Sequence, residues 1–324
     1  MGIRFLQSLI LRKTCFFFSV IIISGSSIAQ EIRPVPQETE IAAIQRRYGL
    51  NVATPLAARV VDASAEVIRN FQEAGMSPRQ HQLTTQERDR INAAFAQLPP
   101  LHKRVLASHL RSVSFLDDMP NTALTSTINP GDSFLLFDIT FRAGILKQNL
   151  SEWITEKERT CFDIAGSGLT VSIDAGRLDA IAYVLMHETT HVVDGSLVIT
   201  PGRKATLVAP NTFVSGVWTD RTVIASPFQN GWLDSIRFRR GRVISIQLAD
   251  SVYNALARTP FVSLYSTSSW HEDLAEFISV YDLTQIRKQP FRIVLHDGNH
   301  ILFSYEPMKS GLVRKRIRYI RRFY

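Results

Sequence analysis

Cysteine is scarce in this chain, which carries only Cys15 and Cys161 among its 324 residues. Cys15 lies in an N-terminal segment that we expect to be removed, so the mature chain cannot form an internal disulfide. The fold must therefore be held by its hydrophobic core rather than by crosslinks. Cys161 could act as a nucleophile, but a buried and inert thiol is the favoured interpretation.

Acidic residues are missing from both ends of the sequence. The first 29 residues carry three basic side chains and the last 16 carry seven, and neither stretch contains Asp or Glu. The stretch between them has 27 basic and 29 acidic residues, although the whole chain has a net charge of +8. The basicity is therefore a property of the ends. Because the nearly neutral body also lacks a recognition motif, the sequence argues against nucleic-acid binding.

Long apolar runs are also absent, because none reaches the roughly 20 residues that a membrane-spanning helix needs. The N-terminal segment combines a basic start, a short apolar run and small residues: Arg4, Arg12 and Lys13, then 15–23, then Ser27, Ile28 and Ala29. These are the parts of a secretory signal peptide. We expect residues 1–29 to be a signal peptide and the mature protein to be exported, to the periplasm or the medium. An uncleaved N-terminal anchor is the alternative.

The rest of the chain has the composition of a packed globular protein, with 45% hydrophobic and 20% charged residues. Residues 30–55 are weakly patterned and are interpreted as a linker or arm, in which 41–48 could form a short helix. Residues 56–110 are then predicted to form a helical subdomain. Its expected helices are 56–74, a helix introduced by a Thr84–Glu87 capping box and running to Phe95, and 101–110.

Alternating patterns replace helical spacing after residue 110 and predict strands at 113–116, 134–141 and 169–173. Further short β-like runs lie at 196–200, 205–208, 222–225 and 243–246, before a predicted helix at 248–256. The mixture predicts an α+β domain over residues 111–308. Residues 309–324 are expected to form a basic C-terminal helix. That helix could meet anionic lipid or an acidic partner, or it could simply pack its apolar side on the domain.

The most informative motif is His187-Glu188-Thr189-Thr190-His191. Residues four apart face the same way on a helix, so His187 and His191 can bind one metal ion while Glu188 points at its open position. This is the HExxH pattern of the zincin metallopeptidases. The helix expected over 177–194 is amphipathic, with one apolar stripe and one stripe of ligands. Two ordinary buried histidines are the alternative.

Catalytic zinc usually has three protein ligands, so a third must lie elsewhere. The metzincin continuation requires Gly and a further ligand where this chain has Asp194 and Leu197, and it is excluded. Glu272-Asp273-Leu274-Ala275-Glu276 instead fits a ligand helix. Glu272 would bind the metal, Ala275 would permit close helix packing, and Glu276 would accept a hydrogen bond from a ligand histidine. An exposed acidic helix face is the alternative.

These two segments resemble the gluzincin group of zinc peptidases, which includes the catalytic domain of anthrax lethal factor and related small bacterial peptidases. In that group an Asp follows HExxH at the position of Asp194, and a Tyr seven residues before the Glu ligand assists the transition state, as Tyr265 would here. A packing role is the alternative for Tyr265. The separation of 81 positions between His191 and Glu272 is long for the group. The resemblance implies a zincin-like domain with a small mixed sheet and two ligand helices.

The sequence thus predicts an exported endopeptidase with one Zn²⁺ per chain, acting on a protein or peptide substrate. Glu188 would act as general base on a zinc-activated water, with Asp194 and Glu276 supporting the ligands. His296 and His300 could assist the transition state, although surface histidines are the simpler interpretation. The alternative function is a catalytically idle zincin-fold binding or scaffold protein at the cell envelope.

Overall fold

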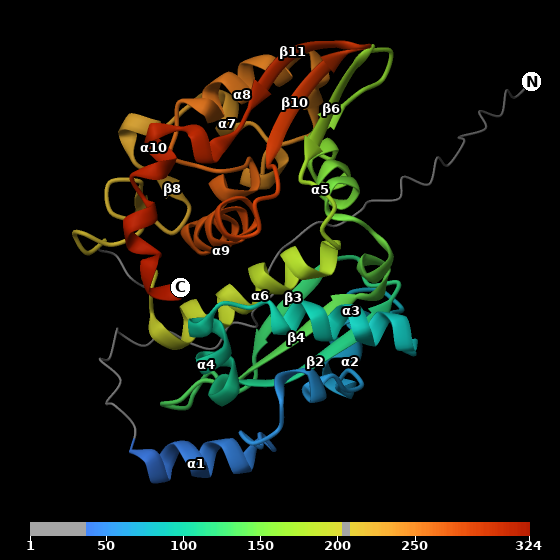
Figure 1. Cartoon of the computed structure of the whole chain (residues 1–324), viewed down its shortest axis with the longest axis vertical. Helices are drawn as coiled ribbons and strands as arrows, with labels where there is room; N and C mark the ends of the chain where they lie inside the picture. Colours follow the sequence, from blue (N-terminus) through green and yellow to red (C-terminus); the bar gives the residue numbers. More distant parts are fainter. Residues whose placement is uncertain (1–36, 203–207) are drawn as a thin grey trace, which may run out of the picture.

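The computed structural model describes residues 37–202 and 208–324 (Figure 1). The predicted signal peptide, and the β-like run at 205–208 apart from its last residue, lie outside these ranges. The α-helices are α1 Glu38–Arg47, α2 Ala65–Glu73, α3 Thr85–Ala96, α4 Pro100–His109, α5 Leu150–Arg159, α6 Ala180–Leu197, α7 Gly231–Asp234, α8 Ala249–Ala257, α9 Trp270–Tyr281 and α10 Gly311–Arg314.

The strands are β1 Arg79–Gln80, β2 Leu110–Asp117, β3 Ala123–Thr127, β4 Phe137–Arg142, β5 Phe162–Asp163, β6 Leu169–Asp174, β7 Trp218–Asp220, β8 Val223–Ile224, β9 Ile244–Ser245, β10 Arg292–Asp297 and β11 His300–Tyr305. The fold is therefore mixed α+β, as the sequence predicts. Within the two described ranges, no helix is long and apolar enough to span a membrane.

The larger sheet has the strand order β1-β2-β4-β3. β2 runs parallel to β4, whereas β1 and β3 are antiparallel to their neighbours. Phe115 on β2 and Phe141 on β4 are buried and stacked with their ring centroids 5.4 Å apart, which anchors the middle of the sheet. β3 forms one edge of the sheet and contacts α6.

α6 lies in the centre of the molecule, between the larger sheet and α9 (Figure 1). It also packs against α3 and α4, so 14 of its 18 residues are buried. The prediction of an amphipathic helix was therefore wrong, because this helix has neighbours on nearly every side. Gly195 allows one close approach, since a Cβ there would lie 3.0 Å from the ring of Phe137.

A second sheet, β11-β10-β6, lies at the other end of the molecule and is antiparallel throughout (Figure 1). α5 packs on β6 and α8 packs on β11. β6 precedes α6 in the chain, as the sequence predicts, but it does not belong to the sheet whose edge faces α6. The strand that lies beside the metal motif is β3, which the sequence analysis did not predict.

The predicted helical region begins differently from expectation. Residues 56–59 form a 3₁₀ turn, and α2 starts only after Ser64, whose side chain caps it. The single helix predicted over 56–74 was wrong, because Arg59 is buried and donates hydrogen bonds to the carbonyls of Leu106 and Ala107 at the end of α4. The other two helices of this region are confirmed, and Thr84 and Glu87 form the expected capping box.

One hydrophobic core joins the helical region to the rest of the protein, since Ile91 of α3 and Phe277 of α9 belong to the same buried cluster.

The short strands β8 and β9 and the helix α8 match the predicted runs, whereas the run at 196–200 is not a strand, because α6 continues to Leu197.

The basic C-terminal segment is not one helix. It consists of α10 and two 3₁₀ turns, and its apolar residues Val313, Ile320 and Phe323 are fully buried against the domain. Four basic residues line a shallow groove of about 480 Å³ on its outer side: Arg314, Lys315, Arg318 and Arg321. Of the two predicted arrangements, the structure therefore shows packing of the apolar side.

Candidate metal centre

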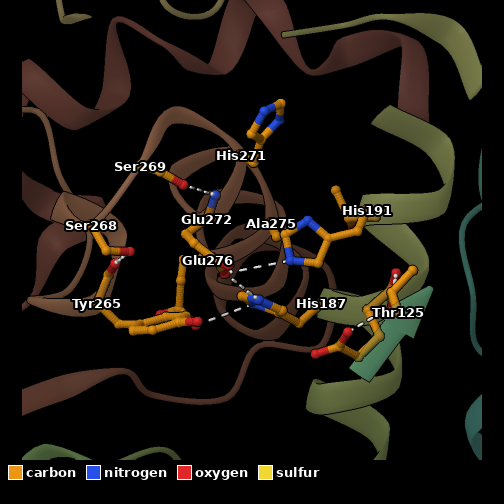
Figure 2. A network of polar contacts seen from close by, with 12 residues as sticks. Thr125, His187, His191, Tyr265, Ser268, Ser269, His271, Glu272, Ala275 and Glu276 are labelled. Atoms are coloured by element: carbon orange, nitrogen blue, oxygen red, sulfur yellow. Dashed lines mark hydrogen bonds and ion pairs between the residues drawn. The ribbon is translucent and has the colours of Figure 1, made fainter. Parts of the chain in front are cut away.

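The predicted ligands come together where α6 crosses α9 (Figure 2). The Nε2 atom of His187 lies 3.0 Å from the Oε2 atom of Glu272, and the Nε2 atom of His191 lies 3.4 Å from the same oxygen. One ligand atom from each of the three residues falls within 4.8 Å of the others. The structure thus brings together two motifs that are separated by 80 residues in the sequence.

This donor set fits zinc. Two imidazole nitrogens and one carboxylate oxygen are a common catalytic zinc set, with the fourth position left to water. Zinc bonds of 2.0 to 2.1 Å in a tetrahedron place ligand atoms about 3.4 Å apart, close to the two contacts of Glu272. The buried surroundings of His187 and Glu272 also favour a bound cation over an exposed acidic helix face.

Glu276 lies one helical turn beyond Glu272 and contacts the ring nitrogen of His187 that faces away from Glu272 (Figure 2). Its Oε1 atom is 3.3 Å from the Nδ1 atom of His187, which leaves Nε2 directed at Glu272. The other carboxylate oxygen accepts hydrogen bonds from Ser263, at 2.7 Å, and from Tyr183, at 3.3 Å. A carboxylate in this position can hold the ring of a metal-binding histidine in place.

Burial and charge oppose each other in this cluster. Burial alone would lower the pKa of His187, but hydrogen bonds to Glu272 and Glu276 and their charges raise it to about 9. Burial would raise the pKa of Glu276, yet the charge of Lys157 and the contact with His187 lower it to about 2. The histidines outweigh burial in the same way at Glu272 and keep its pKa well below the usual range. Both glutamates are therefore held as carboxylates.

Glu188 is buried, and its side chain contacts the edge strand β3. Thr125 on β3 donates a hydrogen bond of 2.7 Å to the Oε2 atom of Glu188. This contact fixes one carboxylate oxygen and ties the predicted general base to the edge strand. Thr125 was not predicted from the sequence, because the strand that carries it was not recognised there.

Tyr265 lies at the site, in a 3₁₀ turn before α9. Its ring centroid is 5.9 Å from that of His187. Burial, followed by the charges of Glu272, Glu188 and Glu276, raises the pKa of its phenol well above the usual value. A hydrogen bond to Glu272 acts in the same direction. The phenol therefore keeps its proton and can donate a hydrogen bond.

Asp194 has a different set of contacts from the one predicted. Its carboxylate accepts hydrogen bonds from the backbone N–H and the hydroxyl of Thr200, both at 2.7 Å. It also lies 2.9 Å from the Nδ1 atom of His271. Asp194 thus fastens the turn after α6 to the start of α9. Val198, at the beginning of that turn, adopts a left-handed conformation with φ of 49°. Asp194 supports the spacing of the two ligand helices rather than contacting a ligand imidazole in the described structure.

The remaining candidates lie elsewhere. Asp273 points away from the metal ligands and is fully buried against Arg316 and Trp218. His296 and His300 belong to the hairpin of β10 and β11, where His296 lies 3.1 Å from Ser172 across the sheet. Both histidines therefore belong to the second sheet and not to the ligand cluster, which agrees with the simpler interpretation of them as surface histidines.

No family model matches this chain, and neither the curated proteins nor the solved structures that were compared with it contain a match. The function of the chain is therefore inferred from its motifs and from the geometry that brings them together.

Proposed function

We propose that the protein is an exported zinc-dependent endopeptidase with a zincin-like catalytic domain. The observation that carries the proposal is the convergence of His187, His191 and Glu272 beside a buried Glu188. A purely structural zinc site needs no such base, so the retained Glu188 favours an enzyme over the alternative of an idle scaffold.

A bound Zn²⁺ would supply a Lewis acid that polarises a scissile carbonyl and lowers the pKa of water towards about 7. His187, His191 and Glu272 hold the ion in this proposal. Glu188 accepts a proton from the attacking water and passes it to the leaving amine, so that one amide bond is broken and one water molecule is consumed. Thr125 keeps the carboxylate of Glu188 in position for both transfers.

Tyr265 donates a hydrogen bond to the oxygen that becomes negative as water attacks the carbonyl. Its high pKa supports this role, because a phenol that stays protonated can donate throughout the reaction. The substrate in this proposal is an extended peptide. β3 is the edge strand beside Glu188, and an extended chain can add to such an edge through main-chain hydrogen bonds.

The test is zinc content together with cleavage of a denatured protein mixture by the purified mature chain. We expect about one zinc per chain in the wild type and in Glu188→Gln, with cleavage reduced at least 100-fold in the variant. Glu73→Gln, an exposed change on α2, is the matched control. Equal cleavage by the wild type and Glu188→Gln would refute the peptidase proposal. Normal zinc content with no cleavage by either would favour the scaffold.

A further inference from the structure

A buried ammonium group lies next to the candidate metal centre. Lys157 on α5 is 7% exposed, and its Nζ atom lies 3.4 Å from the centroid of the Tyr265 ring. The same atom is 3.7 Å from the Oε1 atom of Glu276. Lysine is almost never buried unless it is paired. The location of Lys157, between the Tyr265 ring and Glu276, therefore calls for a function in the site.

The contacts of Lys157 restrain the orientation of Tyr265. A cation over an aromatic face is attracted by the ring quadrupole, more strongly where water is excluded. The edge contact with Phe238, at 5.2 Å, and the tilted contact with His187 enclose the same ring. Because Glu276 also holds the ammonium, the lysine cannot move far from the ring. The ring of Tyr265 is thus held on three sides, by Lys157, Phe238 and His187.

We propose that Lys157 is a positioning residue for Tyr265, whose phenol it holds beside the metal ligands by stacking its ammonium on the ring. This inference rests on the proposed peptidase function, in which the phenol donates to the developing oxyanion. It predicts that the loss of Lys157 affects the transition state more than substrate binding, and only while the Tyr265 hydroxyl is present.

A double-mutant cycle of Lys157→Met, Tyr265→Phe and the combined variant tests this coupling. Met keeps the length of the side chain but removes the charge. We expect Lys157→Met to lower kcat by about 10-fold to 100-fold with KM within about twofold, and Tyr265→Phe to lower kcat by about 100-fold to 1,000-fold. The double variant should be no slower than Tyr265→Phe, and all three should keep about one zinc. Lys147→Met, an exposed change just before α5, should leave kcat unchanged.

Zinc content separates this role from one exercised through Glu276 and His187. If Lys157→Met loses its zinc, the lysine acts on the ligand histidine and the inference is overturned. Multiplicative losses of kcat in the double variant would also overturn it. Lys157→Arg keeps a cation that can stack on an aromatic ring, so it should restore part of kcat relative to Lys157→Met. If Lys157→Arg is no faster than Lys157→Met, the charge does not position Tyr265 and the inference is overturned.

A second cycle does not depend on catalysis and distinguishes failure of the inference from failure of the proposed function. Urea unfolding of Lys157→Met, Tyr265→Leu and their combination reports the contact itself, because Leu removes the ring. We expect the two losses of stability to be clearly less than additive. Additive losses would overturn the inference even in an active enzyme. If the wild type cleaves nothing but the losses are non-additive, the peptidase function fails while the positioning contact stands.

Discussion

Replacement of Arg316 by Met should destabilise the protein much more than its place in a basic C-terminal segment suggests. Its guanidinium is buried and donates hydrogen bonds to both carboxylate oxygens of Asp273 and to the carbonyl of Pro260. It also lies 3.9 Å above the ring of Phe213. Removal of the cation leaves a fully buried carboxylate with one remaining donor, the indole of Trp218.

Breaking a buried ion pair by removing one partner costs about 3–5 kcal/mol. For a protein of this size, such a loss would lower Tm by roughly 10 °C. Burial already raises the pKa of Asp273 despite the opposing effect of Arg316. Without the arginine, the folded-state pKa rises further, so the variant loses more stability as pH increases. The loss should therefore be smaller at pH 5 than at pH 8.

Urea unfolding at both pH values measures this effect, with the exposed Arg322→Met as the control within about 0.5 kcal/mol of the wild type. The double variant Asp273→Asn and Arg316→Met should recover at least half of the loss, because no buried charge remains. An Arg316→Met variant as stable as the control, or a loss that does not change with pH, would refute the reasoning.

Three further predictions concern the site and its surroundings. Glu272→Ala should reduce bound zinc from about one per chain to nearly none, measured by elemental analysis. Thr125→Val should keep its zinc but lower kcat several-fold, since Glu188 loses a hydrogen-bond donor. Burial raises the pKa of Glu158 from 4.5 to about 7. The protonated carboxyl therefore contributes to the free energy of unfolding at low pH, and this contribution is lost as pH rises through about 7. Glu158→Gln should remove up to about 3 kcal/mol of this pH dependence in urea unfolding.

Each of these predictions has a contradicting outcome. Undiminished zinc in Glu272→Ala would mean that Glu272 is not the third ligand. An unchanged kcat in Thr125→Val would mean that Glu188 is positioned by the helix alone. A Glu158→Gln variant with the same pH profile as the wild type would show that the carboxyl of Glu158 does not take up a proton on folding.

The residues of the candidate metal centre could be predicted from the sequence because their spacing is local. His187 and His191 are one turn apart, and Glu272 and Glu276 repeat that spacing on the second helix, so each half of the site can be recognised within five residues. The α+β class and the helices α3, α4, α8 and α9 followed from similarly short patterns.

What could not be predicted depends on contacts between distant segments. β3 is short and largely polar, so its pattern does not stand out, and Thr125 reaches Glu188 only through the sheet. Lys157 could not be singled out from the sequence, because its contacts with Tyr265 and Glu276 come from segments that follow much later in the chain. The pairing of Asp194 with His271 spans 77 residues. For the same reason the buried environment of α6 was misjudged, because burial is decided by which elements pack around it.

The packing of Phe323 on His102 also has a consequence for the order of folding. The two rings lie 5.4 Å apart although 221 residues separate them in the chain, and His102 in turn contacts Thr190 inside the metal motif. Contacts of such long range are formed late and slowly, because the chain must first close a large loop. After dilution from urea, zinc binding should therefore lag behind the recovery of helical circular dichroism. During synthesis, the surroundings of α6 cannot be completed until Phe323 has emerged from the ribosome.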